Sequence, residues 1–382
     1  MKNTMLPNGT RDEFGRTAEI KENIQNRLVD QFKNRGFSKL ITPVLEYADV
    51  FAPLNSTDYR PYQLLDEKGE TMVLRPDLTL PVARVLSTTG VSLPVKWYYS
   101  GDVFRLKKQL SGSYNQLTQA GIEIIGYQDL KADFECIATA LDGCSSLGIN
   151  EAYVQLSHAK FIDDVLNILP LPDPAKESLK AALFEKDLSK FDKLIAPLEK
   201  TDFAPFIKEW PWLFGDFDEV MTILKKLPKN SILNEITKEL QNTKDFIAKE
   251  YPQYQVTMDL SIQAPQSYYT GIVFQGFTEE SPDYLFSGGR YNNLLQSFQN
   301  QNVPAVGVAF DIDALVSRFI GNNSSQQTLV YFDDSQWAKA NQFVKETKNA
   351  TLCLANTLEQ AKTIAEQTNS KLIDLSKEEA NQ

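Results

Sequence analysis

The fold is decided by the stretch QAGIEIIG, which spans residues 119–126. Successive side chains of an extended chain point to opposite faces of a sheet, so Gln119 and Glu123 share one face. The positions that point the other way carry Ala or Ile, which need a hydrophobic core. The pattern therefore predicts a strand over Leu117–Ile125, with its apolar face buried and its polar face toward a cleft.

The segments around this strand predict a combination of helices and antiparallel strands. A second strand is expected over Val95–Phe104, and the polar segment Lys107–Asn115 would connect the two strands. Apolar residues four apart predict a helix over Thr17–Arg35 that ends at Gly36, and similar spacing predicts a long helix over Asp129–Leu147. Such an arrangement is typical of the α+β class rather than of alternating βαβ units.

Other segments extend this prediction along the chain. Pro43 cannot donate a backbone hydrogen bond, which favours a sheet edge or an interface for its segment. Short helices are expected after Thr79 and from the run Ser287-Gly288-Gly289-Arg290-Tyr291. Further strands are expected over Phe37–Glu46, Tyr62–Leu74 (two strands joined at Lys68-Gly69), Ala152–Leu156, Val256–Leu260, Gly271–Phe274 and Val306–Phe310.

Changes in composition predict the domain organisation. Residues 160–252 are rich in Leu, Lys and Glu, are punctuated by prolines and have helical periodicity, so they are expected to form a helical insertion. This insertion would interrupt a core of residues 1–320. The polar run 321–327 is expected to be a linker, and residues 328–382 a small C-terminal βαβαβ unit.

Composition and charge narrow the class of function. The 382 residues, 42% hydrophobic and 23% charged, are typical of a soluble globular protein with more than one domain. There is no run of about eighteen apolar residues, so no membrane span is expected. The N-terminus lacks the apolar core of a signal peptide, which indicates the cytoplasm. A net charge of −11 argues against tRNA as the main partner, because binding requires neutralising phosphates.

The residue counts also limit the kinds of site. The single histidine, His158, argues against most metal sites and against histidine-based catalytic triads, and it is expected to pack or cap. The three cysteines, Cys136, Cys144 and Cys353, show no metal-ligand spacing and are expected to be reduced and structural. Neither a metal nor a cofactor is predicted.

Four segments in order, with a fifth between the last two, suggest a family. They are LPNGTRD at 6–12, GF…PVLE at 36–46, FR…QAGIEIIG at 104–126, APQSYYTG at 264–271, and SGGRY with PAVG at 287–291 and 304–307. Together they resemble class II histidyl-tRNA synthetases and their catalytically silent relatives, the regulatory subunits of short-form ATP phosphoribosyltransferase. The resemblance implies a class II synthetase-like antiparallel sheet core flanked by helices, with a dimer interface around Pro43.

The same resemblance implies a histidine-binding pocket. Asp77 and Thr79 would receive the ligand's ammonium group, and Glu123 and Tyr269 would lie near the imidazole. A carboxylate and a phenol together can satisfy both ring nitrogens. The residues implied are Asp77, Thr79, Arg105, Gln119, Glu123, Tyr268 and Tyr269.

The nucleotide side of the family's site is altered. Lys107 stands where the family has a glutamate, Ser113 and Asn115 replace loop arginines, and Ala264 and Ala314 occupy two further arginine positions. Adenylation depends on preorganised cations around the phosphates, so the resemblance implies no aminoacylation. The segment after Thr328 is also short for the family's anticodon-binding domain, which is a second argument against tRNA.

The resemblance therefore implies a regulatory subunit for the first step of histidine biosynthesis. It would dimerise and join a separate short catalytic subunit in a hetero-octamer. It would be required for activity of that subunit and would confer feedback inhibition by histidine. Two alternatives stay open: an active histidyl-tRNA synthetase, and an amino-acid-sensing paralogue with another partner.

Overall fold

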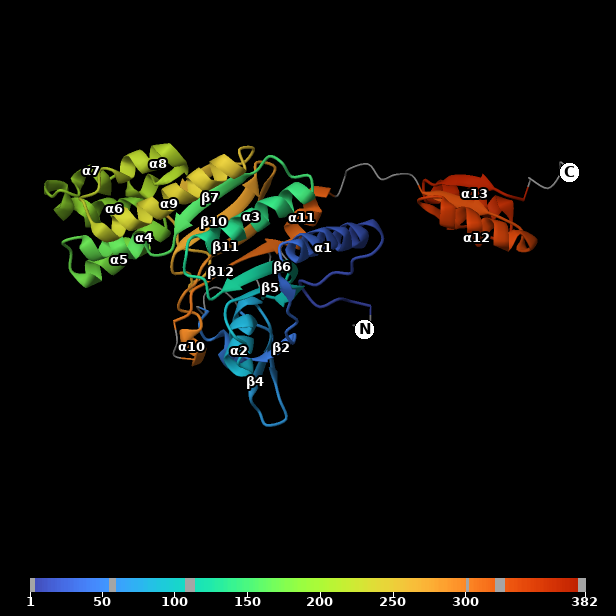
Figure 1. Ribbon diagram of the computed structural model, residues 1–382, viewed down its shortest axis with the longest axis horizontal. Helices are drawn as coiled ribbons and strands as arrows, with labels where there is room; N and C mark the ends of the chain where they lie inside the picture. The colour runs from blue at the N-terminus through green and yellow to red at the C-terminus, as the bar shows by residue number, and fades with distance from the viewer. Residues whose placement is uncertain (1–3, 55–59, 107–113, 300–301, 320–326, 377–382) are drawn as a thin grey trace. The chain divides into compact units, whose positions relative to one another are not determined.

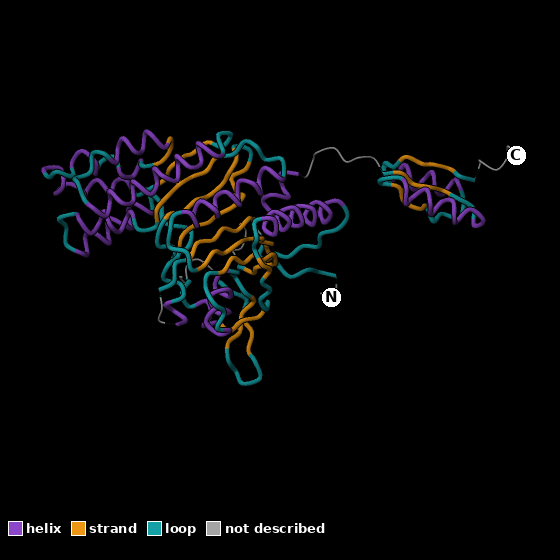
Figure 2. Tube along the Cα trace, viewed as in Figure 1, coloured by secondary structure: helices purple, strands orange, loops and turns teal. Residues whose placement is uncertain are grey.

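The stretch at residues 119–126 lies inside a large, mainly antiparallel sheet in the computed structural model (Figures 1 and 2). The structure describes residues 4–54, 60–106, 114–299, 302–319 and 327–376. Contacts divide the chain into two compact units, Met1–Ile320 and Gly321–Gln382. Nearly all of the predicted linker, residues 321–326, lies outside the described residues.

The main sheet of the described residues has nine strands. In spatial order they are β1 (Ser38–Lys39), β5 (Val95–Phe104), β6 (Gln116–Ile125), β12 (Ala305–Asp311), β11 (Ser281–Arg290), β10 (Ile272–Thr278), β7 (Tyr153–His158), β9 (Gln255–Asp259) and β8 (Phe214–Asp216). The pairs β1–β5 and β7–β9 are parallel and all the other pairs are antiparallel. The α+β class is confirmed, and the strands predicted around residue 120 are confirmed within one residue.

Helices cover one face of this sheet. They are α1 (Arg16–Asn34), α3 (Lys131–Ser146) and α11 (Ile312–Phe319) (Figure 1). Leu28 and Phe32 of α1 are fully buried, and Ala120, Ile122 and Ile124 of β6 join the same core cluster. The apolar side of QAGIEIIG therefore lies in the core, as its alternation predicts, and its polar side is left for the opposite face.

The opposite face carries a second core, built from short helices and a small sheet. The elements are η1 (Ala48–Phe51), α2 (Thr79–Thr89), α10 (Gln296–Gln299), and strands β2 (Leu45–Tyr47), β4 (Thr71–Leu74) and β3 (Gln63–Leu65). Leu80 and Val82 of α2 pack with Tyr99 of β5 and Tyr291 in this second cluster. The paired strands predicted within Tyr62–Leu74 and the helix at Thr79 are confirmed.

The single strand predicted over Phe37–Glu46 is wrong. The chain leaves the main sheet after β1 and enters the small sheet at β2. Between them, the Arg75 guanidinium donates to the carbonyl oxygens of Thr42 at 2.8 Å and Pro43 at 3.2 Å. These two carbonyl groups therefore accept from a buried side chain and not from a neighbouring strand. Pro43 also has no N–H to donate to a neighbouring strand.

The helix predicted to open at Ser287–Tyr291 is also wrong. Residues 287–290 end strand β11 and pair with β10 and β12. A Cβ on Gly288 would lie 2.5 Å from the carbonyl oxygen of Gly307, and one on Gly289 would lie 3.0 Å from the Tyr269 ring. The two glycines are needed for close packing across the sheet and not for a turn.

The segment 160–252 contains a short strand as well as helices. Its helices are α4 (Phe161–Ile168), α5 (Asp173–Phe184), α6 (Leu188–Ile195), α7 (Ala204–Ile207), α8 (Phe217–Leu224) and α9 (Ser231–Glu250), with short 3-10 turns η2 (Ala196–Lys200) and η3 (Trp210–Trp212). Strand β8 leaves this group and pairs with β9 at the edge of the main sheet. The fully buried Trp210 belongs to the same apolar cluster as α1 and α3, so the segment extends the main core.

The C-terminal unit has the predicted βαβαβ order. Its elements are β13 (Thr328–Tyr331), η4 (Asp334–Gln336), α12 (Trp337–Glu346), β14 (Ala350–Leu352), α13 (Leu358–Gln367) and β15 (Lys371–Asp374). The three strands are parallel with β13 in the middle. Val330 packs on the side of α12 and Tyr331 on the side of α13, so each face of the sheet has one helix.

The histidine and the cysteines are structural. His158 is the last residue of β7, which extends two residues beyond the predicted end at Leu156, and its Nδ1 accepts the backbone N–H of Lys160 at 3.3 Å. Its burial agrees with the expected packing role. Cys136, Cys144 and Cys353 are all buried. In the part of the chain that the structure describes, no helix is long and apolar enough to cross a membrane.

Candidate ligand-binding site

One pocket brings together every residue that the sequence analysis assigned to amino-acid binding. It has a volume of about 340 Å³ and lies on the face of the main sheet that α2 covers. The predicted residues in its lining are Asp77, Thr79, Arg105, Gln119, Glu123, Tyr268 and Tyr269. These residues come from strands, a helix start and a loop that are far apart in the sequence, so the fold assembles the pocket.

Glu123 is the most deeply buried charged side chain of the pocket, with 1% of its surface exposed. Thr79 Oγ1 donates to its Oε1 at 2.8 Å and Tyr99 OH donates to the same oxygen at 3.0 Å. Tyr291 OH donates to Oε2. Three neutral hydroxyl groups therefore hold the carboxylate, which leaves its negative charge available to a ligand.

Burial raises the pKa of Glu123 from its ordinary 4.5 to about 7. The three hydroxyl hydrogen bonds favour the ionised form, but they offset only part of the desolvation, and the nearby carboxylate of Asp77 raises the pKa further. Near neutral pH the carboxyl group is thus poised between its two forms. A ligand that brings a ring N–H or a positive charge would favour the ionised form.

A glycine on the neighbouring strand makes room for this carboxylate. Gly307 of β12 is the register partner of Glu123 on β6. A Cβ on Gly307 would lie 1.8 Å from Glu123 Oε2. Because no side chain larger than hydrogen fits there, Gly307 is part of the site although it offers no functional group.

The second buried carboxylate, Asp77, lies where α2 begins. Its Oδ1 accepts the backbone N–H of Leu80 at 2.8 Å, and Tyr268 OH donates to its Oδ2 at 3.5 Å. Burial raises the pKa of Asp77, against the effect of this backbone hydrogen bond and of the Arg105 charge. Arg105 is oriented by a 2.7 Å hydrogen bond from its Nε to the carbonyl oxygen of Pro76.

A loop with two tyrosines forms one wall. Tyr268 and Tyr269 precede β10 and belong to no strand. The Tyr268 ring stands edge-on to those of Tyr269 and Tyr291, with centroids 5.3 and 5.7 Å away. Gln119 lines the floor on the same side as Glu123, as their four-residue spacing predicts.

The far end of the pocket differs in character. Asp283 and Asp311 line it, and burial raises the pKa of Asp311. Ala314 lies on α11, where its backbone N–H donates to Asp311 Oδ1 at 2.9 Å. Asn115 is used structurally, since its Nδ2 donates to the carbonyl oxygen of Asn8 at 3.1 Å. Lys107 and Ser113, two other altered positions, lie outside the described residues.

Sequence reasoning missed three residues of the site: Tyr99, Tyr291 and Gly307. Tyr99 lies on a correctly predicted strand, directly opposite Gly121, but the register of the pair is not visible in the sequence. Tyr291 and Gly307 stood inside segments recognised for their resemblance and received no role. Within the described residues there is also no group of three or more His, Cys, Asp or Glu side chains placed to hold a metal ion.

Comparison with known proteins adds independent findings. The family model described as histidyl-tRNA synthetase matches residues 9–315. The ATP phosphoribosyltransferase regulatory subunit of Lacticaseibacillus casei (strain BL23) is 47% identical over 380 residues, covering 100% of both chains. The protein of the same name from Lactiplantibacillus plantarum is 40% identical over 372 residues, covering 97% of both.

A solved structure has a similar fold over nearly the full length. It is described as an ATP phosphoribosyltransferase regulatory subunit/histidyl-tRNA synthetase from Bacillus halodurans C. It superposes with a TM-score of 0.82 at 25% sequence identity and covers 97% of this chain and 98% of its own. Sequence and fold thus agree on the same group of proteins.

Proposed function

Because this chain belongs to the family of ATP phosphoribosyltransferase regulatory subunits, which has the class II histidyl-tRNA synthetase fold, we propose that it is the histidine-sensing subunit of that enzyme. It would act in the first step of histidine biosynthesis, in the cytoplasm. The short catalytic subunit would need it for activity, and histidine bound to it would inhibit the complex.

The observation that carries the proposal is the buried carboxylate of Glu123 among three neutral hydroxyl donors. A buried carboxylate whose donors are all neutral hydroxyl groups suits a ligand that supplies an N–H donor, such as the imidazole ring of histidine. Tyr269 would contact the other ring nitrogen, while Asp77 and Thr79 would receive the ammonium group. Gln119, Arg105 and Tyr268 would complete the pocket.

The far end of the pocket supports a role without catalysis. Adenylation needs cations that face the phosphates of ATP as charge develops. Alanine occupies positions 264 and 314, where the family's enzymes use arginine, and the carboxylates of Asp283 and Asp311 line the pocket with Arg105 as the cation near them. We therefore propose that the protein binds histidine without activating it.

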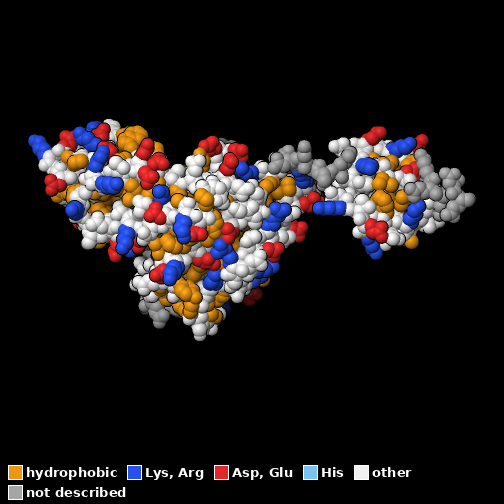
Figure 3. All heavy atoms as spheres, turned by 45° about the horizontal axis from the view of Figure 1, so that its top comes forward, with side chains coloured by type: hydrophobic (Ala, Val, Ile, Leu, Met, Phe, Trp, Pro, Cys, Tyr) orange, Lys and Arg blue, Asp and Glu red, His pale blue; other side chains and the backbone are white. Residues whose placement is uncertain are grey.

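The surface supports a protein partner rather than tRNA. On the face seen in Figure 3, basic and acidic side chains are interspersed and form no continuous basic surface. The net charge is −11, which opposes binding to a polyanion. The catalytic subunit of ATP phosphoribosyltransferase is the proposed partner, in a hetero-octamer.

The segment around Pro43 supports a homodimer. Apolar side chains are exposed there and on the small sheet that follows: Ile41, Val44, Leu45, Tyr47, Leu64 and Leu65. An exposed apolar patch of this kind marks an interaction surface. Sedimentation of an Ile41→Asp variant tests this point, since the variant should be monomeric, and an unchanged mass would place the dimer contact elsewhere.

Reconstitution tests the function itself. Purified chain is mixed with the short catalytic subunit from the same organism, and formation of phosphoribosyl-ATP is followed with and without histidine. We expect activity only in the mixture and inhibition by histidine. Full activity of the catalytic subunit alone would contradict the proposal, and histidine-dependent ATP–pyrophosphate exchange by this chain would show an active synthetase instead. Histidine binding without capture of the catalytic subunit would indicate a sensor with another partner.

A further inference from the structure

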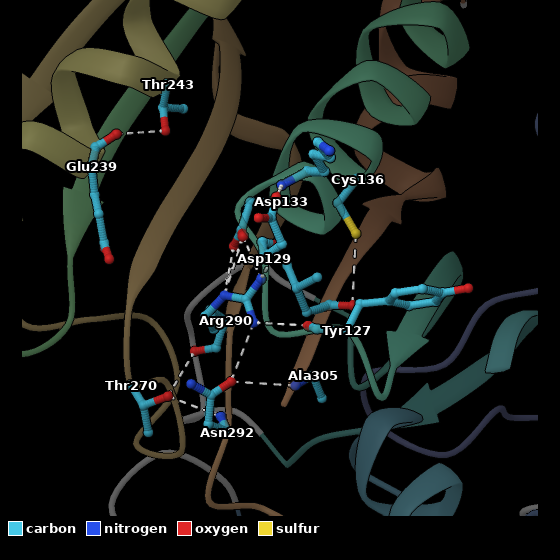
Figure 4. Close-up of polar contacts among 12 residues, drawn as sticks. Tyr127, Asp129, Asp133, Cys136, Glu239, Thr243, Thr270, Arg290, Asn292 and Ala305 are labelled. Atoms are coloured by element: carbon cyan, nitrogen blue, oxygen red, sulfur yellow. Dashed lines mark hydrogen bonds and ion pairs between the residues drawn. The ribbon is translucent and has the colours of Figure 1, made fainter. Parts of the chain in front are cut away.

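A buried ion pair lies directly behind the tyrosine wall of the pocket. Arg290, the last residue of β11, meets Asp133 of α3, and Figure 4 shows the guanidinium and the carboxylate facing one another. Arg290 Nε lies 3.0 and 3.1 Å from the two carboxylate oxygens, and a second nitrogen of the guanidinium also donates to Asp133. Asp133 is fully buried. If one member moved away, the other charge would stay buried without a partner, which is costly. The two side chains are therefore held together.

Carbonyl groups fix the remaining donors of Arg290. Its terminal nitrogens donate to the carbonyl oxygens of Tyr127 and Asp129, at 3.3 and 3.4 Å. The guanidinium is thus held on several sides by the segment that leads into α3 (Figure 4). The backbone of Arg290 is therefore placed by a part of the fold outside the pocket.

This backbone in turn holds the loop that carries the tyrosines. Thr270, which directly follows Tyr269, donates its N–H to the carbonyl oxygen of Arg290 at 2.7 Å. The Thr270 hydroxyl oxygen accepts the N–H of Asn292 at 2.9 Å. Asn292 Oδ1 accepts the N–H of Ala305 on β12 at 3.3 Å. Thr270 therefore joins the loop to both sides of Tyr291 (Figure 4).

Steric contacts show that the fit is close. A Cβ on Gly271 would lie 3.2 Å from Cβ of Arg290, and one on Gly289 would lie 3.0 Å from the Tyr269 ring. The loop can lie against Arg290 only because residue 271 has no side chain. The Tyr269 ring likewise packs directly against Gly289. A small shift of Arg290 or Thr270 would be passed to the tyrosine ring, because packed interiors leave little free space.

We propose that Thr270, anchored by the Asp133–Arg290 pair, is a positioning residue that holds the Tyr269 side chain in its ligand-binding orientation. This inference rests on the proposed histidine binding. Thr270 need not touch the ligand. It acts by joining the tyrosine loop to a rigid part of the fold, so its hydroxyl group determines affinity through Tyr269.

The test uses substitutions at Thr270, because replacing buried Asp133 would risk unfolding the chain. Thr270→Val keeps the side-chain shape and removes the hydroxyl acceptor, whereas Thr270→Ser keeps the acceptor. Calorimetry of the full-length chain should show histidine affinity about tenfold lower for Thr270→Val, and near wild type for Thr270→Ser. The matched control is Thr243→Val on α9, whose hydroxyl donates to the carbonyl oxygen of Glu239 at 2.8 Å, away from the pocket.

A double-mutant cycle shows whether the effect passes through Tyr269. Thr270→Val should cost no further affinity in a Tyr269→Phe background, because the hydroxyl that it positions is already absent. Additive losses would overturn the inference, and so would equal binding by Thr270→Val and wild type. Failure of the wild-type chain to bind histidine would instead overturn the proposed function, and this inference with it.

Discussion

The two ends of the pocket differ in what they require of the chain. At the Glu123 end, a buried carboxylate is held by hydroxyl groups from α2, β5 and the segment after β11, over a glycine of β12. At the Asp311 end, the carboxylates of Asp283 and Asp311 line the wall, and the backbone N–H of Ala314 donates to Asp311. Recognition depends on an enclosed network, whereas activation depends on a few projecting cations. One can therefore be lost without the other.

Replacing a single residue of the hydrogen-bond network around Glu123 is costly. Each hydroxyl group that faces Glu123 would lose a buried acceptor if the carboxylate were absent, and a buried donor that loses its acceptor is costly. A projecting arginine has fewer such ties, so alanine in its place costs the fold less. Under the proposed function, the pocket binds histidine without the cations that would activate it.

Removal of the carboxylate at the Glu123 end should have the largest effect. Glu123→Ala deletes the group proposed to pair with the imidazole and strands three hydroxyl donors. We expect a loss of about 4 kcal/mol in histidine binding, roughly a thousandfold in Kd, measured by calorimetry. Glu135→Gln, at a carboxylate of α3 that pairs with Arg35 and Lys96 and does not line the pocket, serves as the control. Normal binding by Glu123→Ala would move the site to another part of the protein.

The raised pKa of Glu123 predicts a pH dependence of stability. Its folded-state pKa of about 7 exceeds the ordinary value of 4.5, so between these values the folded state binds more protons than the unfolded state. The free energy of unfolding should therefore fall as pH rises from 5 to 8, by roughly 2 to 3 kcal/mol relative to Glu123→Gln. Urea denaturation of both proteins at the two pH values measures this difference. A constant difference would show that Glu123 titrates normally.

The next-largest effect is expected from filling the space beside the Glu123 carboxylate. Gly307→Ala places a methyl group where Glu123 Oε2 lies, so the carboxylate or β12 must move. Overpacking of this kind costs about 2 kcal/mol, and histidine affinity should fall by more than tenfold. Thermal unfolding and calorimetry measure the two effects. Gly148→Ala changes a glycine with open space around it, although its positive φ adds strain, and it should leave affinity intact.

The smallest effect is expected at the opposite end of the pocket. Ala264→Arg restores one cation of the several that adenylation requires. Histidine affinity should change by less than about tenfold, or 1.4 kcal/mol, and no ATP–pyrophosphate exchange should appear. ATP–pyrophosphate exchange by this single variant would contradict the comparison, because one added cation would then be enough to restore activation of histidine.

The contrast between correct and wrong predictions follows the range of the interactions concerned. The helix over Thr17–Arg35 and the strands around residue 120 have strong local periodicity, and the structure has them within one or two residues. The segments Phe37–Glu46 and Ser287–Tyr291 were misassigned. Their conformations depend on the distant Arg75 and on packing against Phe274 and Tyr269. No window of sequence contains those partners.

The site shows the same division. Alternation placed Gln119 and Glu123 on one face, and the resemblance supplied the other five predicted residues, all of which line one pocket. Tyr99 and Gly307 could not be assigned, because their roles depend on strand register. Register is determined by pairing between segments about 20 to 180 residues apart in this chain.

The sequence by itself determined the α+β class, most helices and strands, the family resemblance and the alanines at positions 264 and 314. Those features follow from the period of apolar residues and from the identity of single side chains, which are properties of local stretches. Only the tertiary structure decided that Glu123 is buried among hydroxyl groups with a raised pKa, that Gly307 makes room for it, and that Thr270 joins the tyrosine loop to Arg290. Burial and hydrogen bonding across strands depend on which residues, distant in the sequence, come into contact. Those contacts are determined by packing of the whole core.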